Sequence, residues 1–106
     1  MTNVKNSTNM SESQQSICDW AEGIFGPVAD PRALVERAML EMKELDEAVA
    51  DRDISEIGRE AADVLILLYR LADQFGLDLD GEVQGKMAIN RARKWSAKGD
   101  GTGSHV

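Results

Sequence analysis

The sequence predicts an all-α protein, a bundle of four short helices that assembles as a homo-oligomer. Apolar residues recur with a helical period along the middle of the chain, and capping residues divide this middle into four segments. No segment shows sustained two-residue alternation, so we expect no strand. The length of 106 residues corresponds to a single domain.

The expected helices are bounded by residues that satisfy free backbone groups at helix ends. Ser11, Asp30 and Asp53 are the expected N-caps, and Pro31 after Asp30 suits the first position of a helix. Gly76 stands where a helix C-terminus favours glycine. The four helices are therefore expected at about residues 12–24, 30–51, 53–75 and 80–95.

The two ends of the chain differ in composition from this helical middle. Residues 1–10 are polar and indicate a disordered lead-in, and residues 96–106 are rich in Gly and Ser, which indicates a flexible tail. Residues 11–95 remain as the helical domain.

Charge and cysteine content exclude several classes of protein. The chain has 19 acidic and 12 basic residues, and a net charge of −7 argues against binding to a nucleic-acid backbone. An acidic chain can still bind a phosphate substrate if a bound divalent metal reverses the local charge. Cys18 is the only cysteine, the polar N-terminus does not resemble a signal peptide, and the apolar run 64–69 is too short to span a bilayer. We expect a soluble, cytoplasmic protein that binds no membrane.

The second expected helix carries carboxylates where a core is expected. Glu41 falls inside its apolar arc, and Glu44 lies at the edge of that arc. The apolar positions of this helix are Leu34, Val35, Ala38, Met42, Leu45, Ala48 and Val49.

The third expected helix is apolar over most of its circumference, which predicts burial on several sides and therefore an oligomer. Asp63 lies on its narrow polar strip, and Glu60 borders that strip. A buried carboxylate needs a cation or a metal. Glu41, Glu44, Glu60 and Asp63 together would form an oxygen-rich cage that suits Mg²⁺ or Mn²⁺.

The fourth expected helix carries the opposite charge. Lys86, Asn90 and Arg93 share one stripe, and two cations with an amide between them suit a polyphosphate. Each pattern also has an ordinary interpretation. The acid pairs can be solvated or paired with arginine, the basic residues can complement a helix C-terminus, and Trp20 and Trp95 can be packing residues.

Three motifs in this order resemble those of the MazG-like all-α NTP pyrophosphatases. Residues 41–48 (EMKELDEA) resemble the first motif, and residues 60–65 (EAADVL) resemble the second. The Lys-x-x-x-Asn-x-x-Arg element at residues 86–93 resembles the third. The resemblance covers residues 17–95, and the segment 20–26 resembles the dATP/dGTP pyrophosphohydrolase subgroup. Leu40 departs from the family pattern, which often has a glutamate there.

The resemblance implies hydrolysis of a nucleoside triphosphate to the monophosphate and pyrophosphate, for nucleotide-pool control or house-cleaning. A dNTP is expected, with a weak preference for purines. The four carboxylates would bind Mg²⁺, for which Mn²⁺ substitutes, and Glu41 or Glu44 would orient or deprotonate the attacking water. Lys86, Asn90 and Arg93 would bind phosphate, with Trp20 and Trp95 as candidate base contacts. The active form would be a homodimer or homotetramer.

Two other functions fit the same residues. A phosphoribosyl-ATP pyrophosphatase-like enzyme would share the helices and the metal ligands, although the element at 86–93 favours the MazG side. A non-catalytic helical oligomerisation module would instead neutralise Glu41 and Glu60 with Arg or Lys, and no divalent ion would stabilise it.

Overall fold

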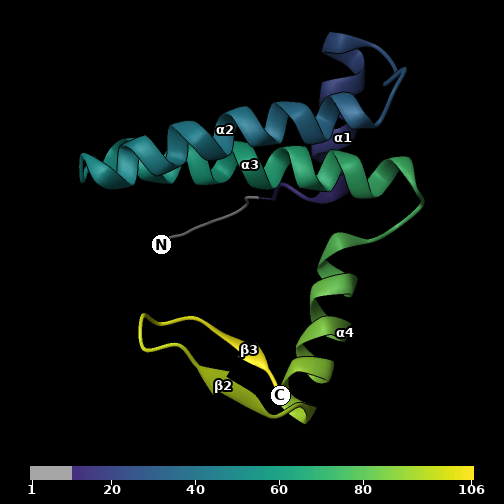
Figure 1. Cartoon of the computed structure of the whole chain (residues 1–106). Coiled ribbons are helices and arrows are strands. Elements are labelled where there is room, and N and C mark those ends of the chain that lie inside the picture. The colour runs from purple at the N-terminus through teal and green to yellow at the C-terminus, as the bar shows by residue number, and fades with distance from the viewer. Residues whose placement is uncertain (1–10) are drawn as a thin grey trace, which may run out of the picture.

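The computed structural model describes residues 11–106, so the expected lead-in at 1–10 lies outside the described residues. Four helices are followed by a two-stranded hairpin (Figure 1). The elements are α1 Gln14–Phe25, α2 Arg32–Ala50, α3 Ile54–Gln74, α4 Leu79–Ala92, β2 Trp95–Ala97 and β3 Gly103–His105. The predicted all-α fold is confirmed in its four helices.

Side-chain caps explain where two of these helices, α1 and α3, begin. Asp53 accepts a hydrogen bond from the Glu56 backbone N–H at 3.2 Å, as predicted for an N-cap. The predicted N-cap Ser11 is wrong. Ser13 caps α1 in a reciprocal capping box with Ser16, so the helix begins later along the chain than expected. Gly76 has a φ of 69°, which confirms the predicted glycine after α3.

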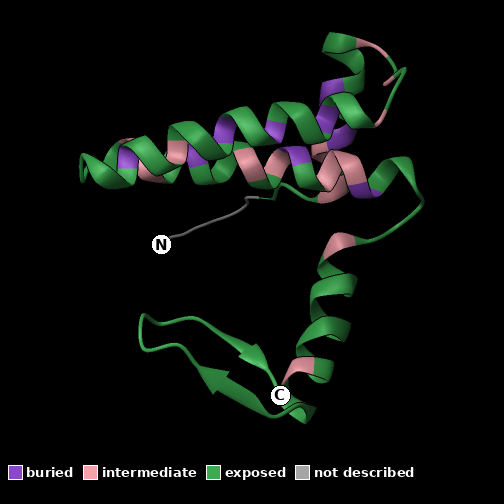
Figure 2. Cartoon of the chain, in the orientation of Figure 1, coloured by how far each residue is buried: buried purple, intermediate pink, exposed green. Residues whose placement is uncertain are grey.

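Helices α2 and α3 form the centre of the fold. They lie side by side, joined by a short turn, and α1 crosses their other end (Figure 1). Leu34, Ala38 and Leu67 form the buried apolar cluster, with Val28 and Leu71 packed against it. Figure 2 shows that the buried residues of these helices lie mainly along their facing sides. This packing aligns the carboxylates of the two helices.

The segment that follows α3 forms a separate arm. We call residues 79–106, which comprise α4 and the hairpin, the C-terminal arm. Neither α4 nor the strands contain a buried residue, and α4 points away from the α2–α3 pair (Figures 1 and 2). Two side chains attach the start of the arm to the rest of the chain. The Gln14 amide donates to the Leu77 carbonyl at 2.7 Å and accepts from the Leu79 N–H at 2.9 Å. The Tyr69 hydroxyl donates to Asp80 at 2.8 Å.

The hairpin corrects the expectation that the chain forms no strand. Strands β2 and β3 pair antiparallel, with Trp95 opposite His105 and Ala97 opposite Gly103. α4 accordingly ends at Ala92, before the expected Trp95. Three-residue strands are too short for an alternation signal, and a Cβ at Gly103 would collide with the Ser96 carbonyl. The glycines that suggested a tail therefore also permit the close pairing of these strands. Whether this hairpin moves as the expected flexible tail stays a prediction.

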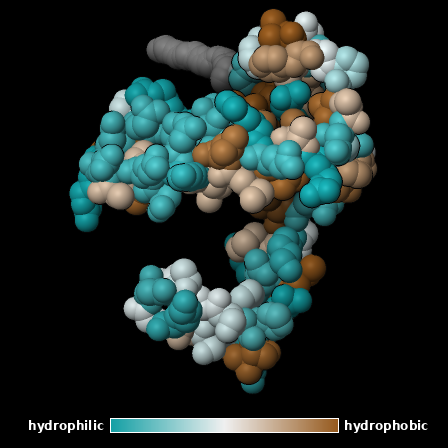
Figure 3. Space-filling model, turned by 45° about the horizontal axis from the view of Figure 1, so that its top comes forward, coloured by the Kyte–Doolittle hydropathy of each residue, from teal (hydrophilic) through white to brown (hydrophobic). Residues whose placement is uncertain are grey.

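A single chain leaves much of its apolar surface uncovered. Large side chains on all four helices stay exposed, among them Phe25, Met39, Leu65 and Met87. Figure 3 shows a mostly hydrophilic end where α2 leads into α3, with hydrophobic surface gathered toward the opposite end. Within residues 11–106, no helix combines the length and apolar character needed to cross a membrane.

Candidate metal centre

Carboxylates from α2 and α3 converge midway along the helix pair. Glu41 of α2 and Glu60 and Asp63 of α3 each offer one carboxylate oxygen, and these three atoms lie within 4.8 Å of one another. Glu41 and Glu60 are each only 7% exposed, whereas Asp63 is exposed. The structure thus brings together three of the four predicted metal ligands.

Helical phase explains why these side chains meet. Glu41 follows Ala38 by three residues and precedes Ala48 by seven, so all three lie on the buried side of α2. Glu60 precedes the buried Leu67 by seven residues on α3. The two acids are therefore buried because the helices pack on this face.

Glu60 is the most perturbed group of the cluster. Its Oε1 atom is buried and has no hydrogen-bond partner among the described residues. Hydrogen bonding with the Glu41 carboxylate, burial and the nearby Glu44 carboxylate together raise the pKa of Glu60 from 4.5 to about 8. A cation among these carboxylates would relieve the same repulsion. An orphaned carboxylate oxygen among further carboxylates fits a hard divalent cation.

Glu44 lies beside this cluster and not inside it. Its side chain is exposed, and its carboxylate is close enough to Glu60 to raise the pKa of that group. The fourth predicted ligand therefore stands at the solvent margin of the site, one helical turn beyond Glu41.

A cavity of about 490 Å³ adjoins the carboxylates. It is lined in part by Trp20, Phe25, Arg37, Glu41, Asp63 and Arg70. The Trp20 and Phe25 rings meet edge to face at 5.9 Å, and the Arg70 guanidinium lies 5.5 Å from the centre of the Phe25 ring. The volume is in the range of small-ligand pockets, and its walls combine acids, cations and aromatic faces.

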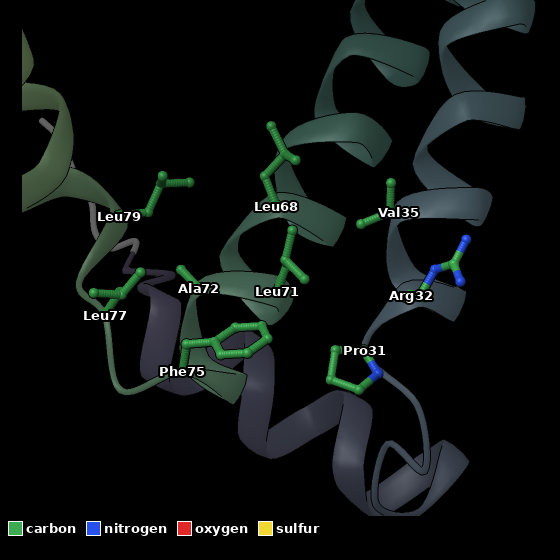
Figure 4. Close-up of a pocket in the computed structure, with 9 residues that line it drawn as sticks. All are labelled: Pro31, Arg32, Val35, Leu68, Leu71, Ala72, Phe75, Leu77 and Leu79. Atoms are coloured by element: carbon green, nitrogen blue, oxygen red, sulfur yellow. The ribbon is translucent and has the colours of Figure 1, made fainter.

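A second hollow of about 460 Å³ has a different character. Leu68, Leu71 and Phe75 of the α3 end face Val35 across it, with Leu77 and Leu79 beyond (Figure 4). Arg32 is the one charged residue of its lining, and no carboxylate reaches it. This hollow therefore has none of the groups that bind a metal.

The predicted phosphate-binding residues lie away from the carboxylates of the same chain. Lys86 and Asn90 belong to α4, Arg93 is its extended C-cap, and none of the three lines the 490 Å³ cavity. α4 carries them away from the α2–α3 pair (Figure 1). Asn90 Oδ1 is buried without a hydrogen-bond partner among residues 11–106.

The two tryptophans lie in different parts of the structure, one beside the carboxylates and one on the C-terminal arm. Trp20 lines the cavity beside the carboxylates. Trp95 begins the hairpin, where its indole N–H donates to the Asn90 carbonyl at 2.6 Å and its ring meets His105 edge to face. Only Trp20 of these two candidate base contacts is placed beside the carboxylates of its own chain.

Comparison with known proteins identifies the family. No family model matches the chain. A Cyanophage S-2L protein named dATP/dGTP diphosphohydrolase is 33% identical over 97 residues, which cover 92% of this chain and 88% of that protein. The solved structure of the Cyanophage S-2L MazG-like pyrophosphohydrolase, bound to dGDP and three catalytic Mn²⁺ ions per active site, matches with a TM-score of 0.69. It is 34% identical and covers 88% of this chain and 92% of that one. The chain belongs to the MazG-like pyrophosphohydrolases.

A longer relative occurs in Salmonella phage PMBT28. That protein, also named dATP/dGTP diphosphohydrolase, is 34% identical over 99 residues, which cover 92% of this chain. The chain spans about a third (31%) of its length. The predicted MazG-like family, near the dATP/dGTP subgroup, is therefore confirmed, and with it membership in a family of hydrolases that act on acid anhydrides.

Sequence reasoning missed three side chains that line the cavity beside the carboxylates. Arg37 precedes Glu41 by one helical turn, Arg70 follows Asp63 by two turns, and Phe25 ends α1. The spacing of the two arginines from the predicted ligands was a usable signal, because residues four and seven apart share a helix face. No local spacing connects Phe25 to the site, since α1 reaches it only through tertiary packing.

Proposed function

We propose that this MazG-like chain hydrolyses a nucleoside triphosphate, in the first place a purine dNTP, to the monophosphate and pyrophosphate. One observation carries the proposal. The buried, unpartnered Oε1 of Glu60 lies in a carboxylate cluster that opens on a cavity with aromatic and cationic walls. This arrangement suits a cation beside a nucleotide. The names of the matched relatives support a dATP or dGTP substrate.

The metal would be held by Glu41, Glu60 and Asp63, with Glu44 at the margin. All four are carboxylates, the ligand type that Mg²⁺ and Mn²⁺ share, so we propose Mg²⁺ with Mn²⁺ as a substitute. When bound, such ions screen phosphate charge and make water a better nucleophile. The Mn²⁺ ions of the Cyanophage S-2L structure support this choice of ligand chemistry.

Two α2 glutamates, Glu41 and Glu44, differ in their fitness as a proton acceptor. Glu41 is buried and ion-paired, whereas Glu44 is exposed and lies outside the group of three ligand oxygens. A base must reach water and keep a free lone pair. We therefore assign proton acceptance to Glu44 and metal binding to Glu41. Trp20 and Phe25 would contact the base through their ring faces and edges.

The phosphate-binding residues would come from a second copy of the chain. Lys86, Asn90 and Arg93 lie on the exposed C-terminal arm, away from the carboxylates beside which the phosphates would lie. The uncovered apolar side chains and the apolar hollow of Figure 4 support a homodimer or homotetramer. In this arrangement the arm of one copy completes the site of another, and Trp95 would enter with that arm.

The test is a nucleotide panel with purified protein and Mg²⁺ or Mn²⁺. Chromatography should show the monophosphate, and a coupled assay should show pyrophosphate, with a purine dNTP as the fastest substrate. Release of orthophosphate, or no turnover with any nucleotide, contradicts the proposal. Including phosphoribosyl-ATP in the panel distinguishes the related branch. A non-catalytic oligomerisation module accounts for the Arg37–Glu41 ion pair, but it would leave the unpartnered oxygen of Glu60 without a role.

A further inference from the structure

An ion pair links the candidate metal site to the adjoining cavity. Arg37 Nη2 lies 3.4 Å from Glu41 Oε1, one turn away on α2. The two side chains differ in burial, because that of Arg37 is 63% exposed and that of Glu41 is 9% exposed. A solvent-facing guanidinium therefore extends over a buried carboxylate that also belongs to the metal-ligand group.

Arg37 and a divalent cation compete for the same carboxylate. A guanidinium beside Glu41 repels a second positive charge there. Glu41 has no other ion pair among the described residues. Arg37 thus neutralises Glu41 in the metal-free protein, and binding of a metal removes the reason for this contact.

The cavity offers Arg37 an alternative partner. Arg37 lines it together with Glu41, Asp63 and Arg70. The two arginines are held differently, because Arg70 lies over the Phe25 ring, whereas Arg37 has only its ion pair with Glu41 among residues 11–106. A long exposed side chain can turn without disturbing the core, and a guanidinium forks onto phosphate oxygens.

We propose that Arg37 exchanges partners, pairing with Glu41 in the metal-free protein and with a substrate phosphate once a divalent cation occupies the carboxylates. This inference rests on the proposed function, since it takes the ligand of the cavity to be a nucleotide. Loss of the Arg37 side chain should therefore change the two affinities in opposite directions. The affinity for the metal should rise because a competing charge is gone, and the affinity for the nucleotide should fall because a phosphate contact is lost.

The experiment measures both affinities for Arg37→Ala. Mn²⁺ binding without nucleotide is followed by the electron paramagnetic resonance signal of free Mn²⁺, and binding of an α,β-imido dNTP at saturating Mn²⁺ is followed by calorimetry. We expect Mn²⁺ to bind about two- to fivefold tighter, the scale of an exposed ion pair. We expect the nucleotide analogue to bind about tenfold more weakly, the scale of a lost charge-assisted hydrogen bond.

Arg59→Ala is the matched control. Arg59 pairs with Glu56 at 3.0 Å, its side chain is 64% exposed, and it does not line the cavity. Its removal deletes the same charge from a similarly exposed arginine whose partner, Glu56, is not one of the candidate metal ligands, so both affinities should stay near the wild-type values. Arg37→Lys keeps the charge without the planar fork. It should restore the Mn²⁺ affinity and recover the analogue affinity only in part.

The outcomes separate this inference from the proposed function. Weaker Mn²⁺ binding by Arg37→Ala, or unchanged binding of the analogue, overturns the partner exchange even if the wild type is an active pyrophosphohydrolase. Equal effects of Arg37→Ala and Arg59→Ala overturn it as well, because the effect would then be one of net charge. A wild type that binds Mn²⁺ and the analogue but hydrolyses no nucleotide contradicts the proposed activity alone. Absence of Mn²⁺ binding by the wild type overturns both.

Discussion

The α2–α3 pair and the C-terminal arm divide the candidate site between them. The pair buries Glu41 and Glu60 and presents a carboxylate cluster, whereas the arm buries no residue and presents Lys86 and Asn90 on an isolated helix. A helix of 14 residues gains little stability alone in water. This difference supports the proposal that the arm packs against a second copy of the chain.

The largest expected effect on activity comes from a substitution in the α2–α3 pair. Glu60→Gln keeps the shape of the side chain but removes a metal-ligand charge, so we expect kcat with Mg²⁺ to fall more than about 100-fold, beyond the loss typical of residues that only support a ligand. Circular dichroism should show an unchanged helix content. Glu56→Gln, on the same helix but paired with Arg59, should keep activity. Full activity of Glu60→Gln contradicts the assigned site.

The next prediction joins the two regions in one experiment. Lys86→Ala and Glu60→Gln should each be inactive, yet chains refolded together should regain about a quarter of wild-type activity if dimers form at random. Each mixed dimer then has one site with an intact carboxylate cluster and an intact arm. A mixture of Glu41→Gln and Glu60→Gln is the control and should regain none, because both chains lack the same half. No recovery in the first mixture indicates that each site uses its own arm.

The carboxylate cluster also predicts a pH dependence of stability. The pKa of Glu60 is raised from 4.5 to about 8 by Glu41, burial and Glu44, so the folded state binds this proton more tightly than the unfolded state. Its contribution to the free energy of unfolding is complete below pH 4.5 and is lost as the pH rises through about 8. In EDTA the melting temperature should therefore fall over this window more steeply for the wild type than for Glu60→Gln. Mn²⁺ should raise the melting temperature most at the upper end. Parallel curves for the two proteins contradict this assignment.

The smallest expected effect is a loss of stability where the C-terminal arm is attached to the α2–α3 pair. Gln14→Ala removes the two hydrogen bonds to Leu77 and Leu79, and we expect a loss of about 1 kcal/mol in urea unfolding. Faster amide hydrogen exchange should appear at Leu79. Gln15→Ala is a matched control on the same helix, since Gln15 bonds only to the exposed Asp19 on its own helix. A larger loss for Gln15→Ala contradicts the role given to Gln14.

Features that depend on neighbours along the chain were predictable from the sequence. The period of apolar residues gave the four helices, Asp53 and Gly76 gave two of their ends, and the position of Glu41 on an apolar arc indicated a buried acid. The motif order indicated the family. These features follow from helical geometry, in which three or four residues fix which side chains share a face. The sequence by itself therefore determined the helices, the family and the identity of the acids.

Tertiary structure alone decided which side chains of different helices and strands lie close together. Helix packing brings Glu41 within reach of Glu60 and Asp63, and it places Phe25 beside Arg70. It also separates the arm from the carboxylates and pairs the strands of the hairpin, where alternation over three residues gives no signal. Distances between elements depend on how their surfaces fit together, and no local period encodes that fit. The sequence thus placed each charge on a helix face, and only the packing of α1, α2 and α3 turned the carboxylates into a site with a cavity beside it.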